Sequence, residues 1–143
     1  PLLRFKTGDI CFHHTEKCAC GRTTMRLGPV IGRKKQMIKY KGTTLYPPAL
    51  YDILNNIEQV ENYVVEVFTN EIGTDEILIH LALKAMPADR HEKSDSVIKA
   101  ITDHFRAKLR VTPTVKFISV AEINVMQNPE MSRKPLKFID KRE

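Results

Sequence analysis

Apolar and polar positions alternate most regularly between residues 37 and 120, and this pattern predicts the main elements of the chain. Two short β-prone runs, 37–40 and 43–46, flank a Lys-Gly pair, which is typical of a hairpin. Two prolines at 47–48 suit the first turn of a helix. The residues after them follow the i, i+3, i+4, i+7 spacing of one buried helix face: Leu50, Ile53, Leu54 and Ile57.

The second half of this region predicts two strands, a helix and a further strand. Alternating apolar residues run through 63–70 and 77–83, with a polar turn between them. One helix face is then marked by Val97, Ile98, Ile101, Phe105 and Leu109. A strand over 115–120 precedes a polar tail that starts at Asn124. This order favours an α+β fold, with helices on one face of a small, mainly antiparallel sheet, close to the ferredoxin-like and ACT-like arrangements.

Residues 1–32 differ from the rest, because they hold all three cysteines and four of the six glycines. Short β-prone runs predict small strands over 2–5, 9–12 and 23–27, with a turn at Gly28-Pro29. We therefore expect a short β-rich segment, 1–32, followed by an α+β domain, 33–143.

The net charge of +6, from 23 basic and 17 acidic residues, favours anionic partners. The basic residues are densest at 33–41 and 133–142, without the interleaved exposed aromatics of single-strand binders, so we expect no nucleic-acid partner. No run approaches the roughly 20 apolar residues that cross a bilayer, so we expect no membrane contact. The first residues lack a start methionine and a signal-peptide layout, which favours the cytoplasm and a chain that begins inside a longer protein. Oligomeric state is unknown from the sequence.

A candidate metal site lies in the first segment. Cys11, Cys18 and Cys20, together with His13 or His14, could offer zinc three thiolates and one imidazole. The Cys-x-Cys pair is tighter than the usual zinc knuckle, so reduced thiols in a strand-and-turn segment are the competing interpretation. The chain has no phosphate-binding GxxxxGK[ST] loop and no GxGxxG, HExxH or GxSxG motif.

Four segments in order resemble motifs of adenylate-forming enzymes, and in particular of the phenylacetate–CoA ligases. They are RFKTGD at 4–9, CACGRT at 18–23, GRKKQMIKYKG at 32–42 and SRKPLKFIDKR at 132–142. The CACGRT segment separates this family from the wider superfamily, and the likeness covers nearly the whole chain.

The resemblance implies roles for residues at both ends of the chain. Asp9 would bind the ribose hydroxyls of ATP, since a carboxylate can accept hydrogen bonds from both. Arg33 would lie on the same ribose side of ATP or AMP. Lys134 would be the catalytic lysine. The family usually has glycine where this chain has Arg133, and glycine there would give the loop conformational freedom that arginine lacks.

The resemblance also implies a hinge. Lys35 would be its pivot, where many of these ligases have a paired acidic sequence instead of Lys35-Gln36. Lys39 and Gly42, in the hairpin, are candidates for a face that contacts coenzyme A.

The implied activity is that of an aryl-acid–CoA ligase in phenylacetate catabolism. A carboxylate would attack the α-phosphate of ATP, with Mg²⁺ present, and coenzyme A would then take the acyl group from the adenylate. Residues 1–32 would end a large amino-terminal adenylation domain, the missing partner from the same chain, and 33–143 would form the mobile domain. The acyl-binding pocket would lie upstream, so this fragment is not expected to be active alone.

Two other classes stay open at this point. A non-catalytic ACT-like or ferredoxin-like module that binds a regulatory ligand would have the same order of elements. A basic RNA-binding α+β domain would show salt-sensitive affinity for oligonucleotides.

Overall fold

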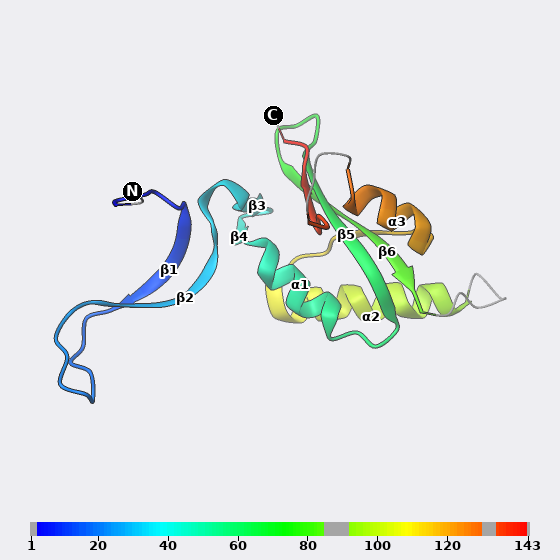
Figure 1. Cartoon of the computed structure of the whole chain (residues 1–143). Helices are drawn as coiled ribbons and strands as arrows, with labels where there is room; N and C mark the ends of the chain where they lie inside the picture. Colours follow the sequence, from blue (N-terminus) through cyan, green and yellow to red (C-terminus); the bar gives the residue numbers. More distant parts are fainter. Residues whose placement is uncertain (1–2, 85–91, 130–133, 143) are drawn as a thin grey trace.

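The computed structural model describes residues 3–84, 92–129 and 134–142 (Figure 1). Its elements in chain order are β1 (Asp9–His14), β2 (Arg26–Arg33), the 3₁₀ turn η1 (Lys34–Gln36), β3 (Ile38–Tyr40), β4 (Thr43–Leu45), α1 (Pro47–Asn55), β5 (Val60–Thr69), β6 (Asp75–Leu83), α2 (Glu92–Leu109), β7 (Thr114–Phe117), α3 (Val120–Gln127) and β8 (Phe138–Asp140). None of the helices in these described ranges has both the length and the apolar character needed to cross a membrane.

The main sheet has four strands in the order β7-β6-β5-β8. Its long central pair, β5 and β6, is antiparallel, whereas β7 joins β6 and β8 joins β5 in parallel. The other two pairs, β1 with β2 and β3 with β4, are antiparallel. The predicted α+β class with mainly antiparallel pairing is therefore confirmed.

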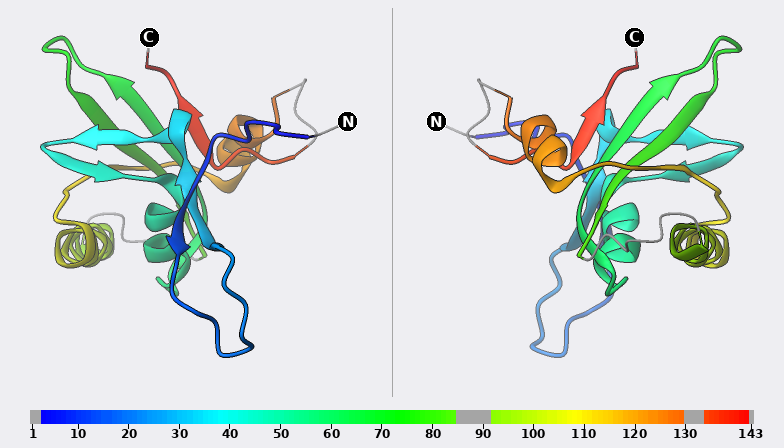
Figure 2. Two further views of the ribbon diagram at one scale, coloured as in Figure 1. Left: turned by 90° about the vertical axis from the view of Figure 1, so that its left-hand side faces the viewer. Right: turned by 90° about the vertical axis from the view of Figure 1, so that its right-hand side faces the viewer.

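The two predicted helices, α1 and α2, cover one face of this sheet, as expected (Figure 2). Their buried residues pack against the odd-numbered positions of β5 and β6, because successive side chains of a strand point to opposite faces. This core contains Leu50, Ile53 and Leu54 from α1, Ile101 and Phe105 from α2, and Val65, Val67, Ile79 and Leu81 from the sheet. Full burial of side chains of this size contributes roughly 1.5–3 kcal/mol each.

A third helix, α3, covers the opposite face and was not predicted. Val64, Ala82 and Ile123 form a second buried cluster there. The prediction of a strand through 115–120 was wrong at its end, because β7 stops at Phe117 and α3 starts at Val120. Ser119 caps the helix: its Oγ accepts from the backbone N–H of Glu122 at 3.2 Å, and the Glu122 carboxylate accepts from the N–H of Ser119 at 2.8 Å. This capping box overrides the β-prone composition.

The predicted hairpin is confirmed. Lys41 and Gly42 both have positive φ angles, of 45° and 81°, as a two-residue type I′ turn requires. Ile38 and Leu45 are register partners and are buried. Tyr40 is also buried, and its hydroxyl donates to the carbonyl of Thr112 at 2.8 Å.

The first strands form a two-stranded ribbon, β1 with β2, which extends away from the main sheet (Figure 1). Of the predicted 2–5 strand, the described residues 3–5 are not in a strand, and the predicted 23–27 strand begins only at Arg26. The prediction of a turn at Gly28-Pro29 was also wrong, because both residues lie inside β2. The pairing there shifts register between Cys11 and His13, so the proline is accommodated at an irregularity in a two-stranded ribbon.

Candidate functional site

The base of the ribbon brings Asp9 and Arg33 together. They are register partners across β1 and β2, and Arg33 Nε lies 3.3 Å from Asp9 Oδ1. The Asp9 side chain is 31% exposed and that of Arg33 is 67% exposed, so both remain accessible to a ligand. The N–H of Asp9 donates to Thr7 Oγ1 at 3.2 Å, which orders the strand start around the carboxylate.

A pocket of about 520 Å³ lies beside this pair, where the ribbon meets η1. Its lining consists of Lys6, Thr7, Gly8, Arg33, Lys34, Lys35 and Gln36. Four of these side chains are cationic and none is acidic, so the pocket favours an anionic ligand such as a phosphate group. The predicted residues Asp9, Arg33 and Lys35 thus gather in one region.

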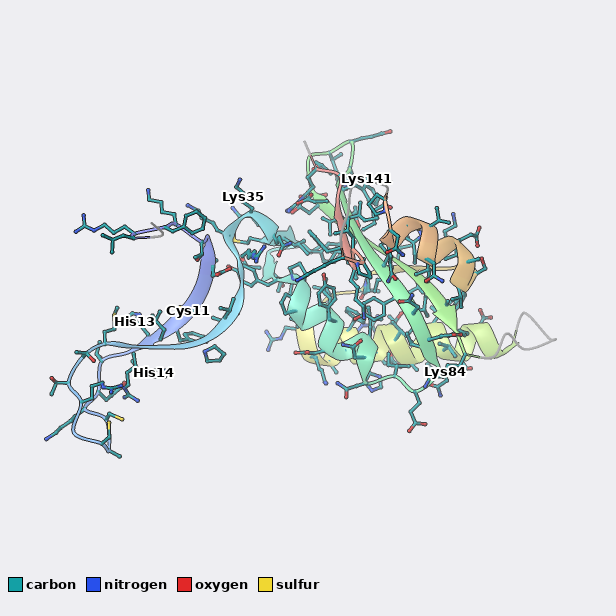
Figure 3. All side chains as sticks on the ribbon, in the orientation of Figure 1. Cys11, His13, His14, Lys35, Lys84 and Lys141 are labelled. Atoms are coloured by element: carbon teal, nitrogen blue, oxygen red, sulfur yellow. The ribbon has the colours of Figure 1, made fainter. Side chains whose placement is uncertain are left out.

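Lys35 also lines a second hollow, of about 400 Å³, on the side of the α+β domain. Its other lining residues are Met37, Thr69, Asp75, Asp140 and Arg142. Figure 3 shows Lys35 at the junction between the ribbon and the rest of the chain. The predicted hinge residue is therefore exposed between two hollows.

Arg142 is the centre of a polar network at this second hollow. Its Nη1 donates to the carbonyl of Met37 at 2.7 Å and to Asp75 Oδ2 at 2.9 Å, and its Nη2 donates to Asp140 Oδ2 at 2.7 Å. The hydrogen bonds from Arg142 hold the pKa of Asp140 below its usual range. The same bonds, first those to Asp140, raise the pKa of Arg142. Asp75 also accepts from the backbone N–H of Lys39 at 3.0 Å.

Lys134 lies on a different part of the domain, in the segment between α3 and β8, and its side chain is exposed. The segment is fastened just after it, at Leu136 and Lys137. The N–H of Leu136 donates to the carbonyl of Gln127 at 2.8 Å, and the N–H of Val65 donates to the carbonyl of Lys137 at 3.0 Å. Lys134 lines neither of the two hollows. Arg133, which stands where the family usually has glycine, lies outside the described residues, so its expected effect on the conformation of the loop stays a prediction.

Gln127, at the end of α3, holds this segment against the sheet and was not singled out from the sequence. It is buried, and its side-chain amide donates to the carbonyl of Tyr63 at 3.0 Å and to Asn62 Oδ1 at 2.9 Å. Because α3 itself was not predicted, sequence reasoning had no element on which to place this contact.

A buried charged cluster on the α3 face of the sheet was likewise missed. Glu66 accepts from Lys141 Nζ at 2.9 Å and lies 3.2 Å from His80 Nε2. Burial raises the pKa of Glu66, but the hydrogen bonds from Lys141 and His80 outweigh it, so the pKa lies below its usual value. Because an ionised carboxylate can only accept, His80 Nε2 is the donor. Glu66 and His80 both lie at even-numbered positions of adjacent strands, which is a sequence signal that they share one face of the sheet. That they are neighbours follows only from the register between β5 and β6.

The remaining coenzyme A candidates, Lys39 and Gly42, are exposed in the β3–β4 hairpin. Both residues are therefore accessible from solvent.

The candidate zinc ligands are not assembled. Cys11 and His13 lie on β1, as Figure 3 shows, whereas Cys18 and Cys20 lie in the segment that connects the ribbon strands. Among residues 3–84, 92–129 and 134–142, no three His, Cys, Asp or Glu side chains are placed to hold a metal ion. A hydrogen bond from the backbone at Arg22, followed by one with the Cys18 thiol, lowers the pKa of the Cys20 thiol. The cysteines are free thiols.

Known proteins match most of the chain. Residues 42–142 match the family described as AMP-binding enzyme C-terminal domain. The phenylacetate–coenzyme A ligase of Thermus thermophilus is 32% identical in a match 133 positions long, and this match covers 78% of this chain and 29% of that protein. The chain thus spans less than a third of the length of this curated relative.

Solved structures share the fold. A domain of phenylacetate–coenzyme A ligase from Bacteroides vulgatus superposes with a TM-score of 0.58 at 22% identity, covering 75% of this chain and 93% of that one. A 2-hydroxyisobutyryl-CoA ligase, solved in the postadenylation state with R3-HIB-AMP, gives a TM-score of 0.66 at 20% identity, covering 94% of this chain and 28% of that one.

Proposed function

The chain belongs to the family of AMP-binding enzyme C-terminal domains, and on that premise we propose that it is part of an aryl-acid–CoA ligase. This ligase joins phenylacetate, or a related carboxylate, to ATP as an acyl-adenylate and passes the acyl group to coenzyme A. The observation that carries the proposal is the Asp9–Arg33 pair beside a cation-lined pocket at Lys35. A non-catalytic regulatory module is not favoured, because the matching family consists of AMP-binding enzymes.

The ribbon is the end of an amino-terminal adenylation domain in this proposal, and residues 33–143 are the mobile domain. Large apolar side chains on or beside the ribbon are more than half exposed: Leu3, Phe5, Phe12, Met25, Leu27 and Val30. Exposed apolar side chains grouped on one element are typical of a contact surface. The amino-terminal part of the same chain is the partner that suits it, since the relative from Thermus thermophilus is more than three times as long as the matched region.

In the first half-reaction a carboxylate oxygen attacks the α-phosphorus of ATP and pyrophosphate leaves. Asp9 accepts hydrogen bonds from the ribose hydroxyls, and Arg33 keeps that carboxylate oriented. The ammonium of Lys134 stabilises the negative charge that develops on the carboxylate and phosphate oxygens. Loss of one such donor costs on the order of 3 kcal/mol, or two to three powers of ten in rate.

In the second half-reaction the thiol of coenzyme A attacks the carbonyl carbon of the adenylate, and AMP leaves. The domain rotates about Lys35, which withdraws Lys134 and presents the β3–β4 hairpin with Lys39 and Gly42. ATP and coenzyme A are co-substrates of the whole enzyme, and a cytoplasmic location is part of the proposal. Mg²⁺ would neutralise phosphate charge, and the described residues include no group of three His, Cys, Asp or Glu side chains that could hold it.

The test separates the two half-reactions in the intact protein. With ATP, pyrophosphate and phenylacetate but no coenzyme A, we expect carboxylate-dependent exchange of label between pyrophosphate and ATP. Addition of coenzyme A should then yield AMP and the thioester. If no acid from a panel of aryl and short carboxylates supports exchange, the proposal is wrong.

A further inference from the structure

Arg142 connects three segments that are far apart in the sequence. Its guanidinium contacts the carbonyl of Met37 before β3, the carboxylate of Asp75 at the start of β6, and Asp140 in β8. The side chain is only 16% exposed, and so is that of Asp75. The network is thus largely shielded from water, where charge-assisted hydrogen bonds are strong.

Arg142 and its partner Asp75 hold the start of β3, whereas the residues just before it are held by the ribbon. On the ribbon side, the N–H of Lys34 donates to the carbonyl of Gly8 at 2.9 Å, so Lys34 is fastened to the ribbon. On the domain side, Met37 is held by Arg142, and the N–H of Lys39 is held by Asp75. Two residues, Lys35 and Gln36, lie between these fastened positions.

The segment that carries Lys134 ends at the same network. After Lys134, the chain bonds to β5 through Lys137, forms β8 and bonds again where the N–H of Lys141 donates to the carbonyl of Val67 at 2.8 Å. Arg142 follows directly. The start of β3 and the end of the Lys134 segment are therefore joined to each other by one side chain.

We propose that Arg142 is a positioning residue that fixes the domain side of the hinge to the strand following Lys134, so that rotation is confined to Lys35 and Gln36. This inference rests on the proposed function for the roles of Lys35 and Lys134. A rotation at these two residues carries the Lys134 segment as part of one rigid body. Without Arg142 the hinge lengthens into β3, and the rotation no longer sets the position of Lys134.

Arginine suits this position because its planar fork donates in several fixed directions at once. Here Nε and Nη2 engage the two oxygens of Asp140, while Nη1 reaches Met37 and Asp75. A lysine has one donor centre and cannot make all of these contacts, so Arg142→Lys keeps the charge but loses the connection.

Lys141 offers a matched control. It is the neighbouring cation at the end of β8, and it pairs with Glu66 of β5, not with any residue near the hinge. Lys141→Met therefore weakens the attachment of β8 without touching Met37. Figure 3 shows Lys141 on the main sheet, well separated from the ribbon strands.

The experiment compares Arg142→Lys, Arg142→Gln and Lys141→Met in the intact protein, with Asp75→Asn as the milder alternative if the arginine variants do not fold. Hydrogen exchange of the amides at 37–39 should accelerate on the order of ten-fold or more in the Arg142 and Asp75 variants, and stay near wild type in Lys141→Met. In the same Arg142 and Asp75 variants, kcat for adenylate formation should fall on the order of ten-fold with the KM for ATP nearly unchanged.

Unchanged exchange at 37–39 in the Arg142 and Asp75 variants, or equal acceleration in Lys141→Met, would overturn the proposal. If the intact protein forms no adenylate with any carboxylate, the proposed function fails, yet the exchange measurement still decides whether Arg142 fixes the start of β3.

Discussion

The ring of Tyr46 lies against the backbone of Gly32, so closely that a Cβ atom at Gly32 would be 2.6 Å from Cδ1 of the ring. Gly32 is in β2 of the ribbon, and Tyr46 immediately precedes α1 of the domain. The ribbon and the α+β domain, which lie on either side of the proposed hinge, therefore touch at a position where only glycine fits.

Gly32→Ala should disfavour this arrangement of ribbon and domain, because the added methyl group meets the ring base and the Cβ of Tyr46, which have little room to move. Overpacking of this kind costs typically 1–3 kcal/mol. The distribution of distances between a probe on the ribbon and a probe on the domain, measured in the intact protein, should therefore shift toward a different arrangement of the two parts. Thr44→Ser, a change at an exposed position of β4, serves as the control. An unaltered distance distribution in Gly32→Ala would show that the contact does not distinguish conformations.

Lys134→Ala in the intact protein should reduce adenylate formation by roughly two to three powers of ten, the loss expected when one charge-stabilising donor is removed. Thioester formation from pre-made phenylacetyl-adenylate should be spared, because the proposal gives the lysine a role in the first half-reaction alone. Lys137→Ala is the matched control, since Lys137 lies over the ring of Tyr63 with 4.6 Å between Nζ and the ring centroid. Equal losses in both half-reactions of Lys134→Ala would contradict its assignment.

Asp9→Asn should raise the KM for ATP about ten-fold or more, because the amide offers the ribose hydroxyls one acceptor oxygen in place of two and the pair with Arg33 loses its charge. Steady-state kinetics with varied ATP would measure this. Glu16→Gln is the control: Glu16 also faces an arginine of the ribbon, Arg26, but at 3.9 Å and with a 74% exposed side chain. A KM for ATP that changes equally in both variants would speak against a specific ribose contact.

Glu66 should make the stability of the domain sensitive to acid. Its pKa is lower in the folded state than its ordinary value of 4.5, so its contribution is fully present above pH 4.5 and disappears as the pH falls from there through the folded pKa. Glu66→Gln should flatten the dependence of the unfolding free energy on pH below 4.5. Urea denaturation of the chain at several pH values would measure the slope, and a slope like that of wild type would refute the role. Glu61→Gln, an exposed change in the same strand, is the control.

Residues in periodic or self-contained local patterns could be placed from the sequence. The paired prolines and the spacing of Leu50, Ile53 and Leu54 define α1, and the Lys41-Gly42 pair defines the hairpin, since both signals act within a few residues. The Ser119-x-x-Glu122 capping box is a local signal of the same kind, but the predicted strand over 115–120 took no account of it.

The polar relationships across the sheet could not be obtained in the same way. Glu66 and His80, or Arg142 and Met37, become neighbours only once strand register and the position of β8 are known. Such contacts join residues that are distant in the chain, and no local pattern encodes them. The roles of Asp9, Lys35 and Lys134 came from the likeness to a family and remain predictions.

The parallel pairing of β8 with β5 covers the middle of the outer edge of a long, apolar strand, at Val65, Glu66 and Val67. Without β8, β5 would present a row of unpaired backbone groups to other molecules, a template for aggregation. The replacement edge is only three residues long and is followed by Lys141 and Arg142, features that discourage edge-to-edge association. Preparations in which proteolysis has removed residues 138–142 should therefore precipitate more readily than the uncleaved chain, whatever their catalytic competence.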